Sequence, residues 1–190
     1  MGHSKQSWKT IRSRLEGSKA NQHPVSIARS VLIGVERHGV VQEIGDEWVI
    51  LAAVRDGGYL NGYMALRLDL IRHVRAEHGL EEFLKQGPAW PPGQVVTGAT
   101  NSPRSLLESG IETSGVLSVF MEKKCERTFF VGVPVKYSKK AAELVTIGTK
   151  ARWEDGTFKV RYKDLTQISF GGDYEKALWA TVGGPASTPT

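Results

Sequence analysis

The sequence predicts a mainly β protein that contains two tandem five-stranded antiparallel small barrels, with short helices at their margins. Three observations lead to this fold class: a repeat at a shift of 94 positions, two sets of short strand-like runs, and a proline-rich stretch between the sets. A chain of 190 residues can bury roughly 70% of its unfolded surface, so a real core is available. The hydrophobic fraction of 40% and the charged fraction of 24% are those of a globular protein.

The repeat relates the stretch from Gly62 to Leu84 to the stretch from Gly156 to Leu178. A period of this length exceeds the roughly 20 to 50 residues of a solenoid and indicates the duplication of a whole domain. One shift of 94 positions, without a gap, aligns Gly62 with Gly156, Met64 with Phe158, Leu66 with Val160, Arg67 with Arg161, Ile71 with Leu165, Val74 with Ile168, Glu81 with Glu175, and Leu84 with Leu178.

Residues 1–24 are predicted to form an N-terminal arm with one short amphipathic helix. Two interpretations stay open: the helix docks its apolar stripe on the first barrel, or the arm is a basic segment that binds RNA or a membrane. The predicted N-cap, apolar stripe and stop signal are Ser7, then Trp8, Ile11 and Leu15, and finally Gly17.

Residues 25–87 are predicted to form the first barrel and a short helix. Their apolar runs are rich in β-branched and aromatic residues and are separated by turns that contain Gly and Asp. A stretch of strict alternation follows, which is typical of a strand with two different faces. The predicted strands are 31–35, 39–44, 48–54, 63–69 and 71–74, and helical spacing covers 80–84.

Residues 88–114 are predicted to form a linker, because Pro88, Pro91 and Pro92 cannot extend a helix or a central strand. Within it, residues 102–110 read as a short helix with Ser at the cap and Pro at the first helical position. The tail 183–190 is expected to be mobile.

Residues 115–182 are predicted to form the second barrel, with strands at 116–121, 128–135, 143–147, 157–162 and 165–170 and a helical turn at 174–178.

Five short strands in each half favour a small barrel, because so small a sheet must curl to bury its apolar face. Gly39 and Gly132 sit at matching places in the second strands, where glycine lets a strand bend as closure requires. Aliphatic third strands and a very short turn between the fourth and fifth strands also recur in both halves. The segments that carry these last two features are 49–51 and 144–147, and 62–74 and 156–168.

This strand pattern resembles the Sm-like family, the small barrels of RNA-associated ring proteins, present here twice over residues 29–75 and 115–170. The resemblance implies an antiparallel barrel in each half and an association with RNA. The second half also resembles a class of uncharacterised bacterial two-barrel proteins that share its ending, Phe-Gly-Gly-x-Tyr-Glu-x-Ala-Leu, at residues 170–178.

The positive charge of the chain is unevenly distributed. The net charge is +5 with a pI near 9.3, which favours a polyanionic partner. Residues 1–20 carry a net charge of +4, residues 21–90 carry −2, and residues 115–190 carry +4. Any binding of nucleic acid must therefore involve the N-terminal arm and the second half rather than the first repeat.

The sequence offers little support for catalysis, metal binding or membrane insertion. The single cysteine, Cys125, excludes an internal disulfide and a cysteine-based zinc site. The five histidines are scattered, and no phosphate-loop, dinucleotide or nucleophile-elbow motif is present. No apolar run approaches the length of a membrane span, and the N-terminus lacks the apolar core of a signal peptide. We therefore expect a non-enzymatic cytoplasmic protein without cofactor, metal or membrane contact.

The candidate nucleic-acid-binding residues belong to the second barrel. One group follows its second strand and the other surrounds the turn between its fourth and fifth strands, and in the Sm-like order these two places lie on one rim. An alternative stays open, in which the lysines protect an edge strand from aggregation and the tyrosine belongs to the core. The residues are Lys136, Lys139, Lys140, Lys159, Arg161, Tyr162 and Lys163.

Aromatic side chains supply a second set of candidates. We expect Trp48 and Trp153 to be packed, and Tyr59 and Tyr63 to contact a partner. The leading hypothesis is a module that binds single-stranded RNA weakly, or serves as an RNA-associated adaptor, through the basic rim of the second barrel. The alternative is a protein-interaction or self-assembly module that uses the edge strands of the barrels, without nucleic acid.

Overall fold

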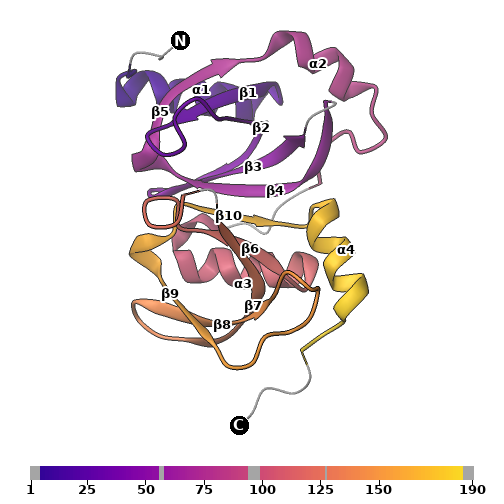
Figure 1. Cartoon of the computed structure of the whole chain (residues 1–190). Helices are drawn as coiled ribbons and strands as arrows, with labels where there is room; N and C mark the ends of the chain where they lie inside the picture. Colours follow the sequence, from indigo (N-terminus) through magenta and orange to yellow (C-terminus); the bar gives the residue numbers. More distant parts are fainter. Residues whose placement is uncertain (1–4, 56–57, 94–98, 127, 186–190) are drawn as a thin grey trace.

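The strands of the protein form one antiparallel sheet that does not close on itself. The computed structural model describes residues 5–55, 58–93, 99–126 and 128–185, and within these ranges it contains ten strands and four α-helices (Figure 1). The predicted mainly β class is confirmed. In chain order the elements are α1 (Trp8–Asn21), β1 (Pro24–Arg29), β2 (Glu36–Ile44), β3 (Trp48–Arg55), β4 (Tyr59–Arg67), the 3-10 helix η1 (Leu68–Leu70), β5 (Ile71–Ala76), α2 (His78–Lys85), η2 (Ala99–Asn101), α3 (Pro103–Ser114), β6 (Leu117–Phe120), β7 (Phe129–Tyr137), β8 (Ala141–Ile147), β9 (Phe158–Arg161), η3 (Tyr162–Asp164), β10 (Gln167–Phe170) and α4 (Asp173–Val182).

The two halves of the chain have the same strand order. The sheet runs β5-β1-β2-β3-β4-β10-β6-β7-β8-β9, so in each half the fifth strand pairs with the first and the rest follow in sequence. The halves meet where β4 pairs with β10, with Leu66 opposite Gln167 and Tyr63 opposite Phe170. Figure 1 shows these two strands side by side at the boundary between the indigo-to-magenta half and the salmon-to-yellow half. The linker therefore connects two halves that share one sheet.

The sequence repeat is also a structural repeat. The 3-10 helices η1 and η3 start 94 positions apart, and each follows an extended arginine, Arg67 or Arg161. Gly62 and Gly156 both have positive φ, +67° and +82°, which explains why glycine stands at both places. One helix precedes the five strands of each half, α1 or α3, and one follows them, α2 or α4.

Three apolar clusters hold the sheet and its helices together. The first half is packed around Ile11 and Leu15 of α1, so these two residues of the predicted stripe dock on this half, whereas the third, Trp8, is 47% exposed. A second cluster crosses the boundary, because Trp48 and Ile50 of β3 pack with Leu106 of α3 and with strands of the second half. A third, smaller cluster lies under α4. The boundary between the halves is thus part of the hydrophobic core.

A buried ion pair also joins the halves. Arg29, at the end of β1, donates two hydrogen bonds of 2.7 Å to Glu122, which follows β6, and the two side chains are 0% and 1% exposed. Arg37 of β2 lies 3.5 Å from the same carboxylate and donates to Gln167 of β10. Burial and the neighbouring charge of Arg29 lower the pKa of Arg37, while Glu122 acts in the opposite direction.

Several element boundaries differ from the sequence prediction. The strand predicted at 31–35 is wrong: this segment is a turn, with Leu32 and Gly34 at positive φ and Ile33 86% exposed, and β1 lies earlier. The helix α1 continues past Gly17 to Asn21, because Ser18 is buried and donates a hydrogen bond to the carbonyl of His23. The terminal helix α4 is longer than the predicted turn.

The predicted linker and tail are described only in part. Residues 94–98 of the linker and residues 186–190 of the tail lie outside the described ranges. The helix predicted within the linker is present as α3, which packs against β6, β7 and β10 and so belongs to the second half. Among the helices that the structure describes, none is both long and apolar enough to cross a membrane.

Candidate nucleic-acid interface

Five of the seven residues predicted to bind nucleic acid line one hollow on the surface of the second half. The hollow has a volume of about 530 Å³. Its walls come from the turn between β7 and β8, from the end of β9 and from η3. The lining residues are Lys139, Lys140, Arg161, Tyr162 and Lys163.

Backbone pairing brings these two segments together. Ala141 of β8 pairs with Arg161 of β9, and the N–H of Tyr162 donates a hydrogen bond of 3.0 Å to the carbonyl of Lys140. The turn before Ala141 is closed by Ser138, whose N–H and hydroxyl both donate to the carbonyl of Ala141. The lysines therefore project from a turn whose backbone is fixed at both ends.

The other two predicted residues lie outside the hollow. Lys136 of β7 and Lys159 of β9 are both in register with Glu143 of β8, so the three form one row across the sheet. In this row a carboxylate lies between two lysines, which lowers their combined charge. The prediction thus combined residues of the hollow with residues of a neighbouring, more neutral row.

The hollow carries an excess of positive charge. Arg161 is paired with Asp164 at 2.7 Å, and the same carboxylate accepts from Lys124. Burial favours a higher pKa of Asp164, but the hydrogen bonds from Lys124 and Arg161 outweigh it and lower the pKa. The other cations of the hollow are exposed and have no carboxylate within 4.0 Å in the described ranges. They are Lys139, Lys140 and Lys163.

Tyr162 forms a fixed wall of the hollow. Its ring packs against the core of the second half, and its hydroxyl is buried without a hydrogen-bond partner among the described residues. Burial raises the pKa of Tyr162. Nearby, burial raises the pKa of Tyr137 to about 12, and Arg104 of α3 lies 4.9 Å from the ring of Tyr137. Tyr162 is therefore held in place by the core.

The first half contains the same geometry without the same charge. The N–H of Leu68 donates to the carbonyl of Glu47, as Tyr162 does to Lys140, and the N–H of Gly45 donates to Trp48, as Ser138 does to Ala141. The matching strand pairs show which side chains of the two halves occupy equivalent positions. Asp46, Glu47 and Asp69 stand where the second half has Lys139, Lys140 and Lys163.

The predicted partner-contact tyrosines have different surroundings. Tyr59 is 42% exposed, and the guanidinium of Arg55 lies 4.7 Å from its ring. Tyr63 stacks on Phe170 at 5.6 Å across the boundary between the halves and donates to the carbonyl of Gly93. Tyr63 is thus engaged within the chain. The packing expected for Trp48 is found, since this side chain is fully buried.

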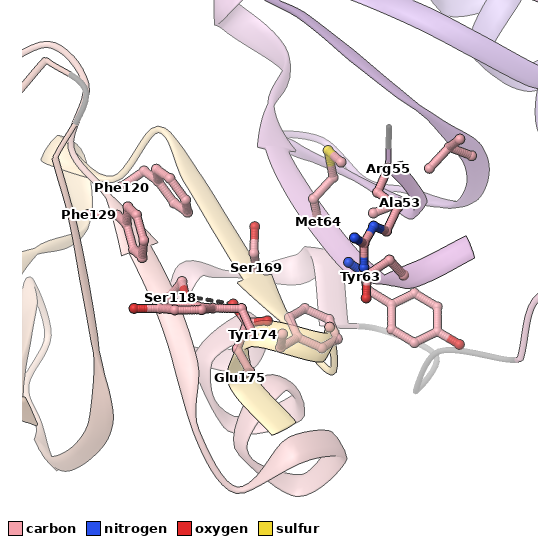
Figure 2. Close-up of a pocket in the computed structure, with 14 residues that line it drawn as sticks. Ala53, Arg55, Tyr63, Met64, Ser118, Phe120, Phe129, Ser169, Tyr174 and Glu175 are labelled. Atoms are coloured by element: carbon pink, nitrogen blue, oxygen red, sulfur yellow. Dashed lines mark hydrogen bonds between the residues drawn. The ribbon is translucent and has the colours of Figure 1, made fainter. Parts of the chain in front are cut away.

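Two further hollows were not predicted. One, of about 500 Å³, is an apolar groove beside α2 that includes Tyr59, Phe83 and Trp90. The other, of about 320 Å³, lies at the boundary between the halves. Figure 2 shows it with Arg55, Tyr63 and Met64 on one side, and on the other Phe120, Phe129, Ser118 and Glu175.

The buried carboxylate in the boundary hollow has a structural partner. Glu175 of α4 accepts a hydrogen bond of 2.6 Å from the hydroxyl of Ser118 (Figure 2). The sequence repeat matches Glu175 with Glu81, but Glu81 is only partly buried and forms an ion pair with Lys85 on α2. The described ranges hold no group of three or more His, Cys, Asp or Glu side chains arranged for a metal ion.

The basic hollow is therefore the site with the clearest chemistry. Its three unpaired ammonium groups, one arginine and one fixed aromatic ring suit an anionic ligand with an aromatic component. Comparison of the chain with protein-family models, with curated proteins and with solved structures found no match.

Proposed function

We propose that the chain is a non-enzymatic module that binds single-stranded RNA weakly, or serves as an RNA-associated adaptor, through the basic hollow of the second half. One observation carries this proposal: Lys139, Lys140 and Lys163 converge beside Tyr162 on backbone that is fixed by hydrogen bonds. Lysines on a rigid turn bind phosphates without the cost of ordering a loop. A tyrosine wall offers apolar contact to a base or a sugar.

The chemistry of the hollow favours the backbone of the RNA over its sequence. Lysine ammonium groups act as compact point charges toward phosphate and lack the rigid planar fork with which arginine makes directed paired contacts. If about four phosphates are neutralised, the logarithm of the binding constant falls with the logarithm of the salt concentration with a slope near −3. Binding is then sequence-tolerant and strongly dependent on salt.

We further propose that each half is a small open barrel of the Sm-like type. The shared strand order and the 3-10 helix between the fourth and fifth strands support it. Close strand contact at the matching glycines also supports it. A Cβ atom on Gly39 would lie 2.6 Å from the carbonyl oxygen of Ala52, and one on Gly132 would lie 2.2 Å from that of Val145.

A second candidate function is head-to-tail self-assembly through strand edges. The observation that favours it is the pairing of β4 with β10, by which one half already extends the sheet of the other. The strands that end the sheet, β5 and β9, are the counterparts of β10 and β4. A second copy can therefore extend the sheet by the same type of pairing.

The test of RNA binding is the affinity for fluorescent mixed-sequence single-stranded RNA at low and moderate salt. We expect the variant Lys139→Ala/Lys140→Ala/Lys163→Ala to lose most of the binding of the wild type. The control Lys19→Ala/Lys150→Ala/Lys176→Ala removes the same charge from exposed positions elsewhere and should change binding much less. Equal losses in the two variants, or no binding by the wild type at low salt, would reject the proposal.

A further inference from the structure

The outer edge of β5 is covered by the N-terminal arm. The backbone N–H of Gln6 donates a hydrogen bond of 2.9 Å to the carbonyl of Arg72. The side-chain amide of Gln6 pairs with both backbone groups of Val74: its oxygen accepts from the N–H at 3.0 Å and its NH₂ donates to the carbonyl at 3.3 Å. The guanidinium of Arg14 in α1 donates to the same carbonyl. The arm thus satisfies edge groups that a neighbouring strand would otherwise take.

The same edge positions in the second half are used to join the two halves. At a shift of 94 positions, Arg72 and Val74 of β5 correspond to Thr166 and Ile168. The carbonyl of Thr166 accepts a hydrogen bond from the N–H of Arg67, and Ile168 pairs with Ala65 of β4. Gln6 therefore forms hydrogen bonds with the same backbone positions of β5 that β4 pairs with on β10.

Among the described residues, none covers the opposite end of the sheet in this way. In the part of the chain that the structure describes, β9 has a single neighbouring strand, β8. In β9 and the residue that follows it, even-numbered residues direct their backbone N–H groups toward β8. The N–H of Tyr162, for example, donates to the carbonyl of Lys140. The N–H groups of Lys159 and Arg161 consequently point away from the sheet, as the N–H of Arg67 does toward β10.

We propose that Gln6 and Arg14 form an edge cap that competes with β9 of a second copy of this chain for β5. This inference rests on the second candidate function, head-to-tail assembly, and adds its regulation. The cap is part of the same chain, so its effective concentration is on the order of millimolar and it excludes a partner present at micromolar concentration. Release of the cap exposes β5 to β9 of another copy.

Charge affects the exchange between the cap and a second copy. In the register of β4 on β10, Val74 would lie opposite Lys159, and Arg72 would lie opposite Arg161. Like charges at opposite positions destabilise a strand pair, and salt screens the repulsion. Assembly after release of the cap should therefore strengthen with salt, whereas RNA binding at the basic hollow should weaken.

The test compares oligomeric state in solution at about 100 μM protein, a concentration well below the effective concentration of the cap. The variant Gln6→Pro/Arg14→Ala removes the hydrogen bonds of the cap, and its control, Lys9→Ala/Arg12→Ala, changes two exposed side chains of α1 that are not part of the cap. Light scattering should give the monomer mass of 20.9 kDa for wild type and control and larger masses for the cap variant. Adding Lys159→Pro, which removes an outward N–H of β9, should restore the monomer.

Amide hydrogen exchange at Val74 gives an independent readout that does not need assembly. In the Lys159→Pro background, loss of the cap should accelerate exchange of this amide by about tenfold or more while core amides such as that of Val25 stay protected. An assembled wild type would overturn the cap and leave head-to-tail assembly intact. A folded cap variant that stays monomeric, or an assembly that persists with Lys159→Pro, would overturn both.

Discussion

The two halves of this protein have the same backbone at corresponding places and opposite charge. In each half a three-residue turn between the second and third strands lies against a 3-10 helix, and the same two backbone hydrogen bonds hold them. The first half presents Asp46, Glu47 and Asp69 there, whereas the second half presents three lysines. The repeat therefore sets the shape of the site, and side-chain charge determines which half can bind a polyanion.

The edges of the halves differ in a similar way. Positions of the fifth strand that pair with β4 in the second half are covered by Gln6 in the first. The segment before the first helix of the second half takes a different partner, because Thr100 donates to the carboxylate of Glu43 in β2. The equivalent strands β5 and β10 thus have different neighbours, because Gln6 lies against β5 and β4 lies against β10.

The largest expected effect tests whether the halves form one folding unit. Glu122→Ala leaves Arg29 buried without its counter-charge, so we expect a loss of about 3 to 5 kcal/mol in the free energy of unfolding. The control is Asp173→Ala, which breaks the exposed pair between Arg55 and Asp173 and should cost at most about 1 kcal/mol. Urea denaturation followed by far-UV circular dichroism measures both. Two separate transitions in the wild type would contradict a single unit.

Much of the fold was accessible from sequence because its signals are local. Alternation, glycine and proline positions and the 94-residue repeat located most strands and α3. The prediction of a strand at 31–35 is wrong because the apolar residues of this segment suggest a strand, whereas Ile33 is exposed. The actual strand, β1, precedes it and contains polar residues such as Ser26 that are nevertheless buried. Composition alone does not distinguish an exposed apolar turn from a strand.

The long-range contacts of the molecule were not accessible from sequence. The pairing of β4 with β10, the Arg29–Glu122 ion pair and the Gln6 cap each join residues that are far apart in the chain. In the candidate site, the clustered lysines and the expected strand order were sufficient to place the five residues of the hollow near one another. They did not indicate that Lys136 and Lys159 lie outside the hollow, in one row with Glu143, because this depends on the strand register.

A smaller effect separates the two matching glycines. Both have positive φ, so alanine at either position costs about 1 to 2 kcal/mol for the backbone alone. A Cβ atom on Gly62 would also lie 2.3 Å from the backbone nitrogen of Gly172, whereas on Gly156 it would meet no described atom within 4 Å. We expect Gly62→Ala to lose about 3 kcal/mol or more and Gly156→Ala about 1, measured by urea denaturation. Equal losses would mean that the two halves do not press together at Gly62.

The smallest expected effect tests whether RNA binding depends on the geometry of the hollow or only on the net charge of the protein. In a protein whose second hollow is silenced by Lys139→Ala/Lys140→Ala/Lys163→Ala, the substitutions Asp46→Lys, Glu47→Lys and Asp69→Lys place three lysines on the matching backbone of the first half. We expect them to restore RNA affinity by about fivefold to tenfold at low salt. The control is Glu82→Lys/Glu112→Lys/Glu126→Lys, which adds the same charge at exposed positions without the turn.

The outcome of this transplant decides what the duplication supplies. A gain that exceeds the control means that the turn and the 3-10 helix form a phosphate-binding frame in both halves, used in one and reversed in charge in the other. Equal gains mean that RNA responds only to the overall charge, and the hollow then has no special role. Because the backbone hydrogen bonds agree within 0.1 Å between the halves, 2.9 and 3.0 Å at η1 and η3, a difference between the variants must come from the placement of the lysines.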